Sequence, residues 1–227
     1  MDFSLTDEQK ALQRIVASFA KNEIAPIALE MDKRGEFPWE AYRKFAKNIG
    51  LHCPAAPEEY GGSGLDTLAT VIAAEELAKG CAGFAVTIAA NGLATYPVLI
   101  AGNEDQKKRF FDIILPGALG GFCLTESGAG SDAGAISTSA VREGGEYVIN
   151  GSKRFITNGS LASVYTVFAS IDKANGTKGL CTFLVERDRP GVSVGKHEDK
   201  LGIRCSDTAE VIFEDVRIPV GNLLGKE

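Results

Sequence analysis

The segment from Cys123 to Asp132, CLTESGAGSD, has the residue types of a turn that binds an anion. Consecutive small residues let backbone N–H groups approach a negatively charged oxygen closely, and Ser131 adds a hydroxyl donor. Thr125 follows a short apolar run, where its hydroxyl can face a polar heterocycle lying along a strand. The segment therefore predicts a phosphate or pyrophosphate site, although a glycine-rich connection between strands explains the local sequence equally well.

Two other motifs do not fit these residues. Gly128, Gly130 and Gly134 have the spacing GxGxxxG, which is one residue longer than the dinucleotide fingerprint. A nucleophile elbow needs glycine two positions before Ser131, but Ala129 stands there. We therefore predict neither a Rossmann site nor a serine nucleophile in this segment.

Composition and charge are typical of a soluble globular protein. The 227 residues are 44% hydrophobic and 24% charged, which is enough for one large or two ordinary domains. The net charge of -6 argues against nucleic acid or an anionic membrane as a partner. The amino terminus is acidic where a signal peptide is basic, and no apolar run approaches the roughly 20 residues that span a bilayer. We expect a cytoplasmic protein.

The cysteines and histidines are scattered along the chain. An odd number of cysteines without a CxxC pair argues against a disulfide framework and a structural zinc site, so we expect reduced, buried thiols and no metal. His197 lies in GKHEDK, which predicts a solvated loop, and the only other histidine is His52. The five cysteines are Cys53, Cys81, Cys123, Cys181 and Cys205.

The first half of the chain predicts helices. Thr6 and Gln9 form a capping box, and Leu12, Ile15, Val16, Phe19 and Ile24 follow with helical spacing. Further helices are expected from Pro38 to Gly50, as a buried pair from Asp66 to about Ala101 with a break near Gly80–Gly83, and from Glu104 to Leu115.

After Pro116 the sequence predicts strands. EGGEY and the Asn150–Gly151 dipeptide are hairpin signals. We therefore predict an α+β fold, with an all-α helical domain over residues 1–117 and a small antiparallel β-barrel or sandwich over residues 118–227. The expected strands are Gly121–Leu124, Ser137–Arg142, Tyr147–Ile149, Lys153–Ile156, Val164–Ser170, Leu180–Glu186 and Thr208–Phe213.

Several ordered segments resemble the landmarks of the acyl-CoA dehydrogenases, most similarly the bacterial short-chain, butyryl-CoA group. Together they are far more specific than any one of them. They are PEEYGGSG at Pro57–Gly64, CLTESGAGSDAGA at Cys123–Ala135, NGSKRFITNG at Asn150–Gly159, DKLGIRCSDT at Asp199–Thr208 and VIFEDVRIP at Val211–Pro219.

The resemblance implies an FAD enzyme. A glutamate removes the α-proton of an acyl-CoA thioester, the β-hydride passes to flavin N5, and an electron-transferring flavoprotein accepts the electrons. Ser131 would also touch the CoA, and Thr125 would bond the pyrimidine edge of the flavin. The implied cofactor contacts are Phe122, Cys123, Leu124 and Thr125 along the isoalloxazine, Gly130 and Ser131 at the pyrophosphate, and Phe155, Ile156 and Thr157 as a second wall.

The sequence departs from the family pattern at two positions and at its end. Phe155 stands where the family usually has tryptophan, and Ser127 where it has proline. After NLLGKE the family continues into a third, helical domain that supplies the catalytic glutamate and most of the tetramer interface. We therefore assign no catalytic base here and interpret Glu126 and Asp132 as loop anchors.

Other features and hypotheses remain open at this stage. Arg204, Ser206 and Thr208 are best explained as structural, and Trp39 as part of the helical core. A same-fold flavin oxidase or monooxygenase is an alternative. So is a non-catalytic FAD- or CoA-binding or assembly fragment, which would expose apolar surface for a further domain.

Overall fold

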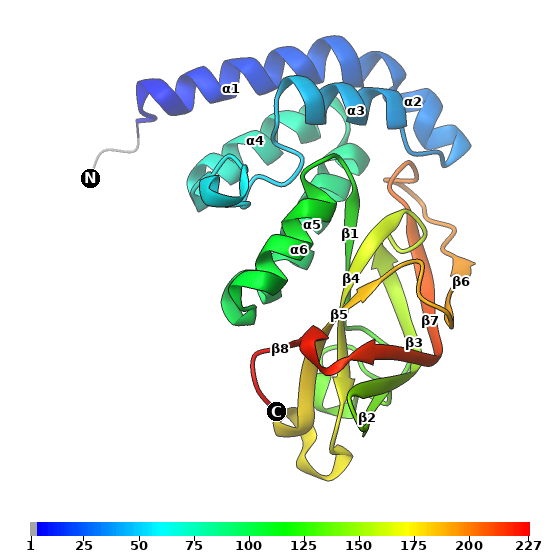
Figure 1. The fold of residues 1–227 in the computed structure, drawn as a ribbon. Helices are drawn as coiled ribbons and strands as arrows, with labels where there is room; N and C mark the ends of the chain where they lie inside the picture. Colours follow the sequence, from blue (N-terminus) through cyan, green and yellow to red (C-terminus); the bar gives the residue numbers. More distant parts are fainter. Residues whose placement is uncertain (1–3) are drawn as a thin grey trace. The chain divides into compact units, whose positions relative to one another are not determined.

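The computed structural model describes residues 4–227, so the first three residues of the predicted domain 1–117 lie outside the described residues. The chain divides into two compact units. The helical unit is the chain up to Gly92 together with Asp199–Ser206, and the β unit is Leu93–Glu198 with Asp207–Glu227. Helices precede strands, which confirms the predicted α+β class (Figure 1). The division at residues 117 and 118 stays a prediction.

The helices begin and end close to where their capping and breaking residues predict. Thr6 Oγ1 accepts from the Gln9 amide at 3.2 Å, and Gln9 Oε1 accepts from the Thr6 amide at 3.0 Å, which completes the capping box. Gly50 has a φ of 76° just beyond the third helix. The helices are α1 Asp7–Phe19, α2 Ala25–Arg34, α3 Trp39–Asn48, α4 Thr67–Gly80, α5 Ala82–Ala101 and α6 Glu104–Ile114.

The apolar stripe of the first helix is narrower than the sequence predicts. Val16, Phe19 and Ile24 are buried, and α1 packs along α4. Ile15 is 53% exposed, so the apolar face that the spacing predicts is only partly buried. It is adjacent to the buried stripe at an edge of the helix, where spacing alone does not separate core from surface.

Helix α5 corrects the expectation that no segment is long enough to span a bilayer. By length and composition its 20 residues pass that test. More than half of the apolar window, 56%, is buried inside the protein. Asn91 is buried and donates to the His52 carbonyl at 2.8 Å, and the Thr87 hydroxyl donates to Ser206 at 3.1 Å. These contacts are those of a core helix.

The β unit is built on a sheet whose order is β6-β7-β3-β2-β4-β5-β8, with β1 beside β4. The β1–β4 and β2–β4 pairs are parallel, so the sheet is mixed rather than purely antiparallel. Tyr147, Tyr165, Phe183 and Phe213 pack in its core. The strands are β1 Leu119–Cys123, β2 Ser139–Glu143, β3 Glu146–Thr157, β4 Ala162–Ser170, β5 Leu180–Glu186, β6 Val192–His197, β7 Thr208–Pro219 and β8 Leu223–Leu224.

One predicted hairpin is present and the other is wrong. β2 and β3 meet at the EGGEY turn, where Gly144 has a φ of 63°. Strand β3, however, runs straight through Asn150–Gly151, with a bulge against β7. A Cβ on Gly151 would lie 2.4 Å from Thr138 Oγ1, so this glycine permits close packing of neighbouring backbone.

The segment predicted as a solvated loop around His197 is partly strand. β6 ends at His197, whose side chain is 62% exposed, with Nδ1 3.2 Å from Asp207 Oδ1. Sequence analysis missed this strand because its charged residues are typical of a loop. A strand at the edge of a sheet, however, needs few apolar side chains.

Candidate functional site

Strand β1 presents two faces with different roles. The Cys123 side chain lies in the β core and is fully buried, and burial raises the pKa of its thiol. Phe122, the preceding residue, points to the opposite face, where its ring centroid is 5.1 Å from that of Phe168. The hydroxyl of Thr166, which pairs with Phe122, is buried without a hydrogen-bond partner. Cys123 can therefore meet a ligand only through its backbone.

The turn after β1 carries free donors. Leu124 and Thr125 are partly buried, whereas Gly130 and Ser131 are exposed. Within residues 4–227, the amides of Gly130 and Ser131 and the hydroxyls of Ser131 and Thr125 have no hydrogen-bond partner. A Cβ on Gly128 or Gly130 would meet open space. Small residues and unsatisfied donors are the features that an anion-binding turn requires, so the residues fit a phosphate-bearing ligand.

Glu126 anchors this turn through hydrogen bonds to Ser137 and Thr138. Its carboxylate accepts from the Ser137 amide and hydroxyl at 2.7 and 2.6 Å. The Thr138 amide and hydroxyl donate to it at 3.0 and 2.5 Å. Asp132 Oδ1 accepts from the Gly134 amide at 3.1 Å. Both acids are therefore loop anchors, as the sequence predicts, and Glu126 is already occupied by partners.

Lys153 completes the network from strand β3. Its side chain is fully buried, and its Nζ lies 2.7 Å from Glu126 Oε1 and 3.1 Å from the Leu124 carbonyl. Sequence analysis missed this ion pair. A lysine at an inward-facing position of a strand was the signal that could have predicted the ion pair. A buried ammonium requires a charged partner.

Electrostatics keep Glu126 ionised. Burial raises the pKa of the carboxyl, but the hydrogen bonds from Lys153, Ser137 and Thr138 outweigh burial and lower the pKa to about 2. Burial lowers the pKa of the Lys153 ammonium, and Glu126 opposes that shift. The result is a charged, hydrogen-bonded cluster that stabilises the turn.

The lowered pKa of Glu126 predicts a dependence of stability on pH. A depressed carboxyl pKa contributes stability above its ordinary value of 4.5, and the contribution is lost as pH falls toward about 2. The shift corresponds to about 3 kcal/mol. Urea unfolding at several pH values should show wild type losing its advantage over Glu126→Gln across this window. A constant difference from pH 7 to pH 2.5 would contradict the assignment.

The segment Phe155–Thr157 lies beside the turn. The Arg154 amide donates to the Thr125 carbonyl at 2.8 Å, which joins strand β3 to the end of β1. The Phe155 side chain is 59% exposed, whereas Ile156 is 2% exposed and belongs to the core. Thr157 is partly buried and pairs with Thr208. Phe155 and Thr157 can therefore offer side chains to a ligand, and Ile156 only its backbone.

Asn158 forms a second link between strand β1 and the end of strand β3. Its φ is 63°, and its Nδ2 donates to the Gly120 carbonyl of β1 at 3.1 Å. Its amide donates to the Asp207 carbonyl at 3.0 Å. Asparagine tolerates the left-handed conformation better than most residues. Sequence analysis named the neighbouring residues and missed this one.

Phe155 is strained and exposed, so we predict that its role is in binding. Its φ of 58° is costly for a residue with a Cβ. In Phe155→Gly, the relief of strain offsets the greater freedom of glycine in the unfolded chain, so Tm should change by less than roughly 3 °C. FAD affinity should fall by at least about fivefold, because an exposed aromatic contact is lost. Calorimetry and FAD titration measure both, and a large loss of Tm with unchanged affinity would contradict the prediction.

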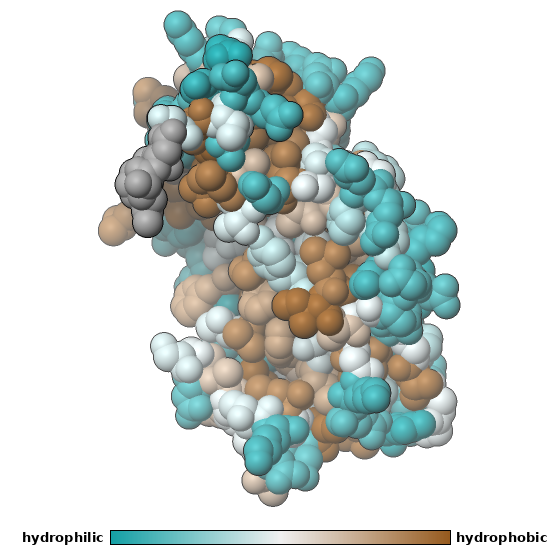
Figure 2. Space-filling view, turned by 90° about the vertical axis from the view of Figure 1, so that its left-hand side faces the viewer, coloured by the Kyte–Doolittle hydropathy of each residue, from teal (hydrophilic) through white to brown (hydrophobic). Residues whose placement is uncertain are grey.

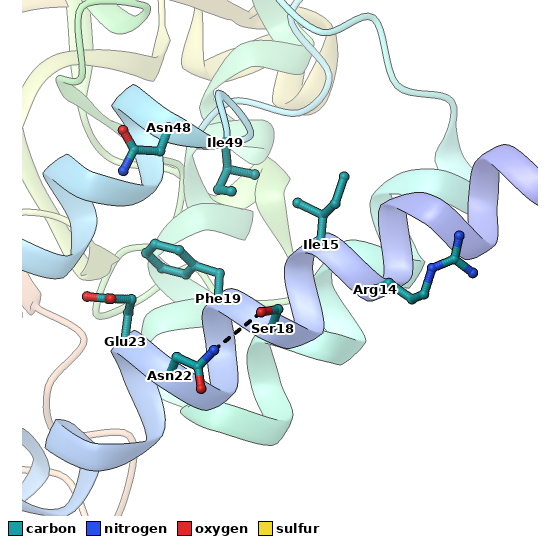
Figure 3. A pocket seen from close by; sticks show the side chains of 8 residues that line it. All are labelled: Arg14, Ile15, Ser18, Phe19, Asn22, Glu23, Asn48 and Ile49. Carbon is teal, nitrogen blue, oxygen red and sulfur yellow. Dashed lines mark hydrogen bonds between the residues drawn. The ribbon is translucent and has the colours of Figure 1, made fainter.

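A hollow also lies in the helical unit of the described residues. Figure 3 shows a hollow in the helical unit where Ile15, Phe19 and Ile49 come together, with Asn22 donating to Ser18 at 3.3 Å. Residues 4–227 contain no cluster of three His, Cys, Asp or Glu side chains that could hold a metal ion.

Comparison with protein families places both halves of the chain. The model of the acyl-CoA dehydrogenase N-terminal domain matches residues 6–118, and that of the middle domain matches residues 121–216. The short-chain specific acyl-CoA dehydrogenase of Clostridium acetobutylicum is 44% identical over 229 residues, covering 100% of this chain and 60% of that protein. An acryloyl-CoA reductase (NADH) of Anaerotignum propionicum is 44% identical over 230 residues, covering 100% and 58%.

Solved structures give the same result. A chain in a structure of the electron transferring flavoprotein of Acidaminococcus fermentans superposes with a TM-score of 0.95 at 44% identity, covering 100% of this chain and 60% of that one. Butyryl-CoA dehydrogenase from Megasphaera elsdenii gives 0.94 at 41%, covering 100% and 61%. An acyl-CoA dehydrogenase complexed with FAD from Bacillus anthracis gives 0.87 at 35%, covering 98% and 38%. The chain thus spans about 60% of the length of the curated relatives it matches.

Proposed function

Because this chain belongs to the acyl-CoA dehydrogenase family, we propose that it forms the FAD-facing wall of an enzyme that dehydrogenates an acyl-CoA thioester. Members of the family are FAD flavoproteins, and one of the structural relatives is complexed with FAD. When bound, the flavin supplies the acceptor for the β-hydride of the thioester. The observation that carries the proposal is the pair of exposed residues Gly130 and Ser131, whose free donors lie in the turn that the buried Glu126 cluster holds.

The donors of the turn divide between two parts of the ligand. The Thr125 hydroxyl would serve as a fixed donor to the pyrimidine edge of the flavin, where such a donor favours negative charge. The Gly130 and Ser131 amides would bind the pyrophosphate, and the Ser131 hydroxyl would also contact the CoA portion. Leu124 and Phe122 supply apolar contact along the ring.

The second wall, Phe155–Thr157, would offer a mainly apolar surface, in contrast to the polar donors of the turn. Phe155 would cover the flavin ring and exclude water, and Thr157 would lie on the side of flavin N5. Cys123 and Ile156 contribute backbone only, because their side chains are buried in the β core. These residues would give a bound flavin one polar and one apolar surface and would keep solvent away from it.

No carboxylate of the described site is assigned as the base. Glu126 accepts five hydrogen bonds, and its low pKa makes it a weak proton acceptor. The catalytic glutamate is proposed to come from the family's C-terminal helical domain. We further propose that electrons pass to an electron-transferring flavoprotein, and that the complete enzyme is a cytoplasmic homotetramer of fatty acid metabolism.

Titration of the purified chain with FAD tests the proposal. The absorbance and fluorescence of FAD should change on binding, and butyryl-CoA added without oxygen should leave the bound flavin unbleached. Ser131→Ala should weaken FAD binding by about tenfold, the value of one hydrogen bond to a charged group. Ser127→Ala, in the same turn, is the matched control and should have no effect. A folded chain that binds no FAD, or equal effects of the two variants, would overturn the proposed site.

The direction of electron flow is a second question that one relative raises. The acryloyl-CoA reductase is as similar as the short-chain dehydrogenase, at 44% identity. Reduction of the complete enzyme by butyryl-CoA, compared with oxidation of its reduced form by acryloyl-CoA, distinguishes the two activities. A rapid reaction of the reduced flavin with oxygen would instead identify the oxidase alternative.

The assembly hypothesis rests on exposed apolar side chains. Figure 2 shows brown, apolar surface among teal side chains on the face it draws. On α4, Leu68 and Val71 are 51% and 54% exposed, and on α5 Ile100 is 83% exposed. Such side chains favour contact with further protein, which the complete enzyme would provide.

A further inference from the structure

Two of the five cysteines lie side by side within the helical unit. The sulfur atoms of Cys81 and Cys205 are 3.5 Å apart, although 124 positions separate them in the sequence. Cys81 lies between α4 and α5 and is partly exposed, which corrects the expectation that all five thiols are buried. Cys205 is 1% exposed. A disulfide requires the sulfurs to approach by only about another 1.5 Å.

Arg204 and Ser206, the sequence neighbours of Cys205, form hydrogen bonds to helices of the same unit. The Arg204 amide donates to Asp32 Oδ1 at 2.7 Å, and its Nε donates to the Asp32 carbonyl at 3.2 Å. The Ser206 hydroxyl accepts from Thr87 at 3.1 Å. These contacts give Arg204 and Ser206 structural roles, although both lie before strand β7 rather than on a strand. They also hold Cys205 against Cys81 rather than leaving it on a free loop.

The first turn of α5 leaves room for the second sulfur. A Cβ at Gly83 would lie 2.5 Å from Cys205 Sγ, closer than such atoms approach. Glycine at this position therefore allows Cys205 to sit over the beginning of the helix. The same helix end can direct its amides at a thiolate on Cys81.

The two thiols differ in acidity. The hydrogen bond from Cys205 lowers the pKa of Cys81 to about 6, burial opposes this, and the Phe84 and Gly83 amides add to the lowering. The same hydrogen bond and burial raise the pKa of Cys205. Since thiolate is the nucleophile, Cys81 attacks first and Cys205 follows as the resolving thiol.

We propose that Cys81 and Cys205 form a reversible intramolecular disulfide when a peroxide oxidises the protein. The Cys81 thiolate attacks one peroxide oxygen, so an S–O bond forms, the O–O bond breaks and hydroxide leaves. The Cys205 sulfur then attacks Cys81, an S–S bond forms, the S–O bond breaks, and the oxygen leaves with the Cys205 proton as water. The two sulfurs together lose two electrons, and the peroxide is reduced to water. A dithiol reverses the reaction.

The experiment treats the purified chain with a small excess of hydrogen peroxide. Two of the five thiols should be lost, and peptide mapping should find one cross-link, between the Cys81 and Cys205 peptides. The bond closes a long loop, so Tm should rise by more than roughly 5 °C, and dithiothreitol should reverse the rise. Cys205→Ser should accumulate a sulfenic acid on Cys81 that dimedone traps. Cys181→Ser, the matched control, should form the disulfide normally.

Four results would overturn the proposal, and the first three concern the thiols and the cross-link. They are five intact thiols in a folded, peroxide-treated chain, a cross-link that uses any other cysteine, and a cross-link between two chains. A sulfenic acid on Cys81 that persists in wild type would also overturn it, because Cys205 would then have failed to resolve it.

Discussion

Lys153→Met should lower the Tm of the chain by roughly 10 °C. The substitution keeps an unbranched side chain one atom shorter, but it leaves the Glu126 carboxylate buried without its counter-charge, which costs about 3–5 kcal/mol. Lys153 is fully buried and lies 2.7 Å from Glu126. The variant also lacks the hydrogen bond from Lys153 to the Leu124 carbonyl. FAD affinity should therefore fall together with stability. Calorimetry and FAD titration measure the two effects.

Two further variants separate charge from packing. In Lys153→Met with Glu126→Gln, the amide oxygen can still accept from Ser137 and Thr138 and no charge is buried alone. The double variant should therefore be more stable than Lys153→Met. Lys108 forms an exposed pair with Asp112 at 2.6 Å, so Lys108→Met should change stability by less than about 0.5 kcal/mol. If the double variant loses the sum of both single losses, the ion pair is not the cause.

Asn158→Leu should destabilise the chain by about 3 kcal/mol. Leucine is strained at the φ of 63°, and it cannot donate to the buried Gly120 carbonyl. Both segments of the candidate FAD site depend on this link between β1 and β3, so FAD binding should weaken as well. Urea unfolding and FAD titration measure the outcome.

Asn158→Gly is the control that separates conformation from hydrogen bonding. Glycine accepts the positive φ and loses only the side-chain bond, so the loss should be about 1 kcal/mol. Equal losses for leucine and glycine would mean that the left-handed conformation is not important. No loss for glycine would mean that the bond to Gly120 contributes nothing.

Much of the fold follows from local features of the sequence. The Thr6 capping box, the glycine at position 50 and the break at Gly80–Gly83 act within a few residues of themselves, and the structure has helix ends at each of them. The EGGEY turn places β2 beside β3 for the same reason. Local signals fail where packing against residues distant in the sequence determines the backbone conformation. Gly151 has a positive φ, yet the strand continues there because the glycine makes room for Thr138.

The sequence by itself determined the α+β class and the family resemblance, and it predicts the anion-binding chemistry of the turn at Gly130 and Ser131. These depend on residue types in short, ordered stretches, which can be read without knowing distant neighbours. Only the tertiary structure decided that Glu126 pairs with Lys153, that the Cys123 and Ile156 side chains lie in the core, and that Cys81 meets Cys205. The physical reason is that burial, ion pairing and thiol contact depend on distances between residues far apart in the chain. Periodicity and turn chemistry carry no information about those distances.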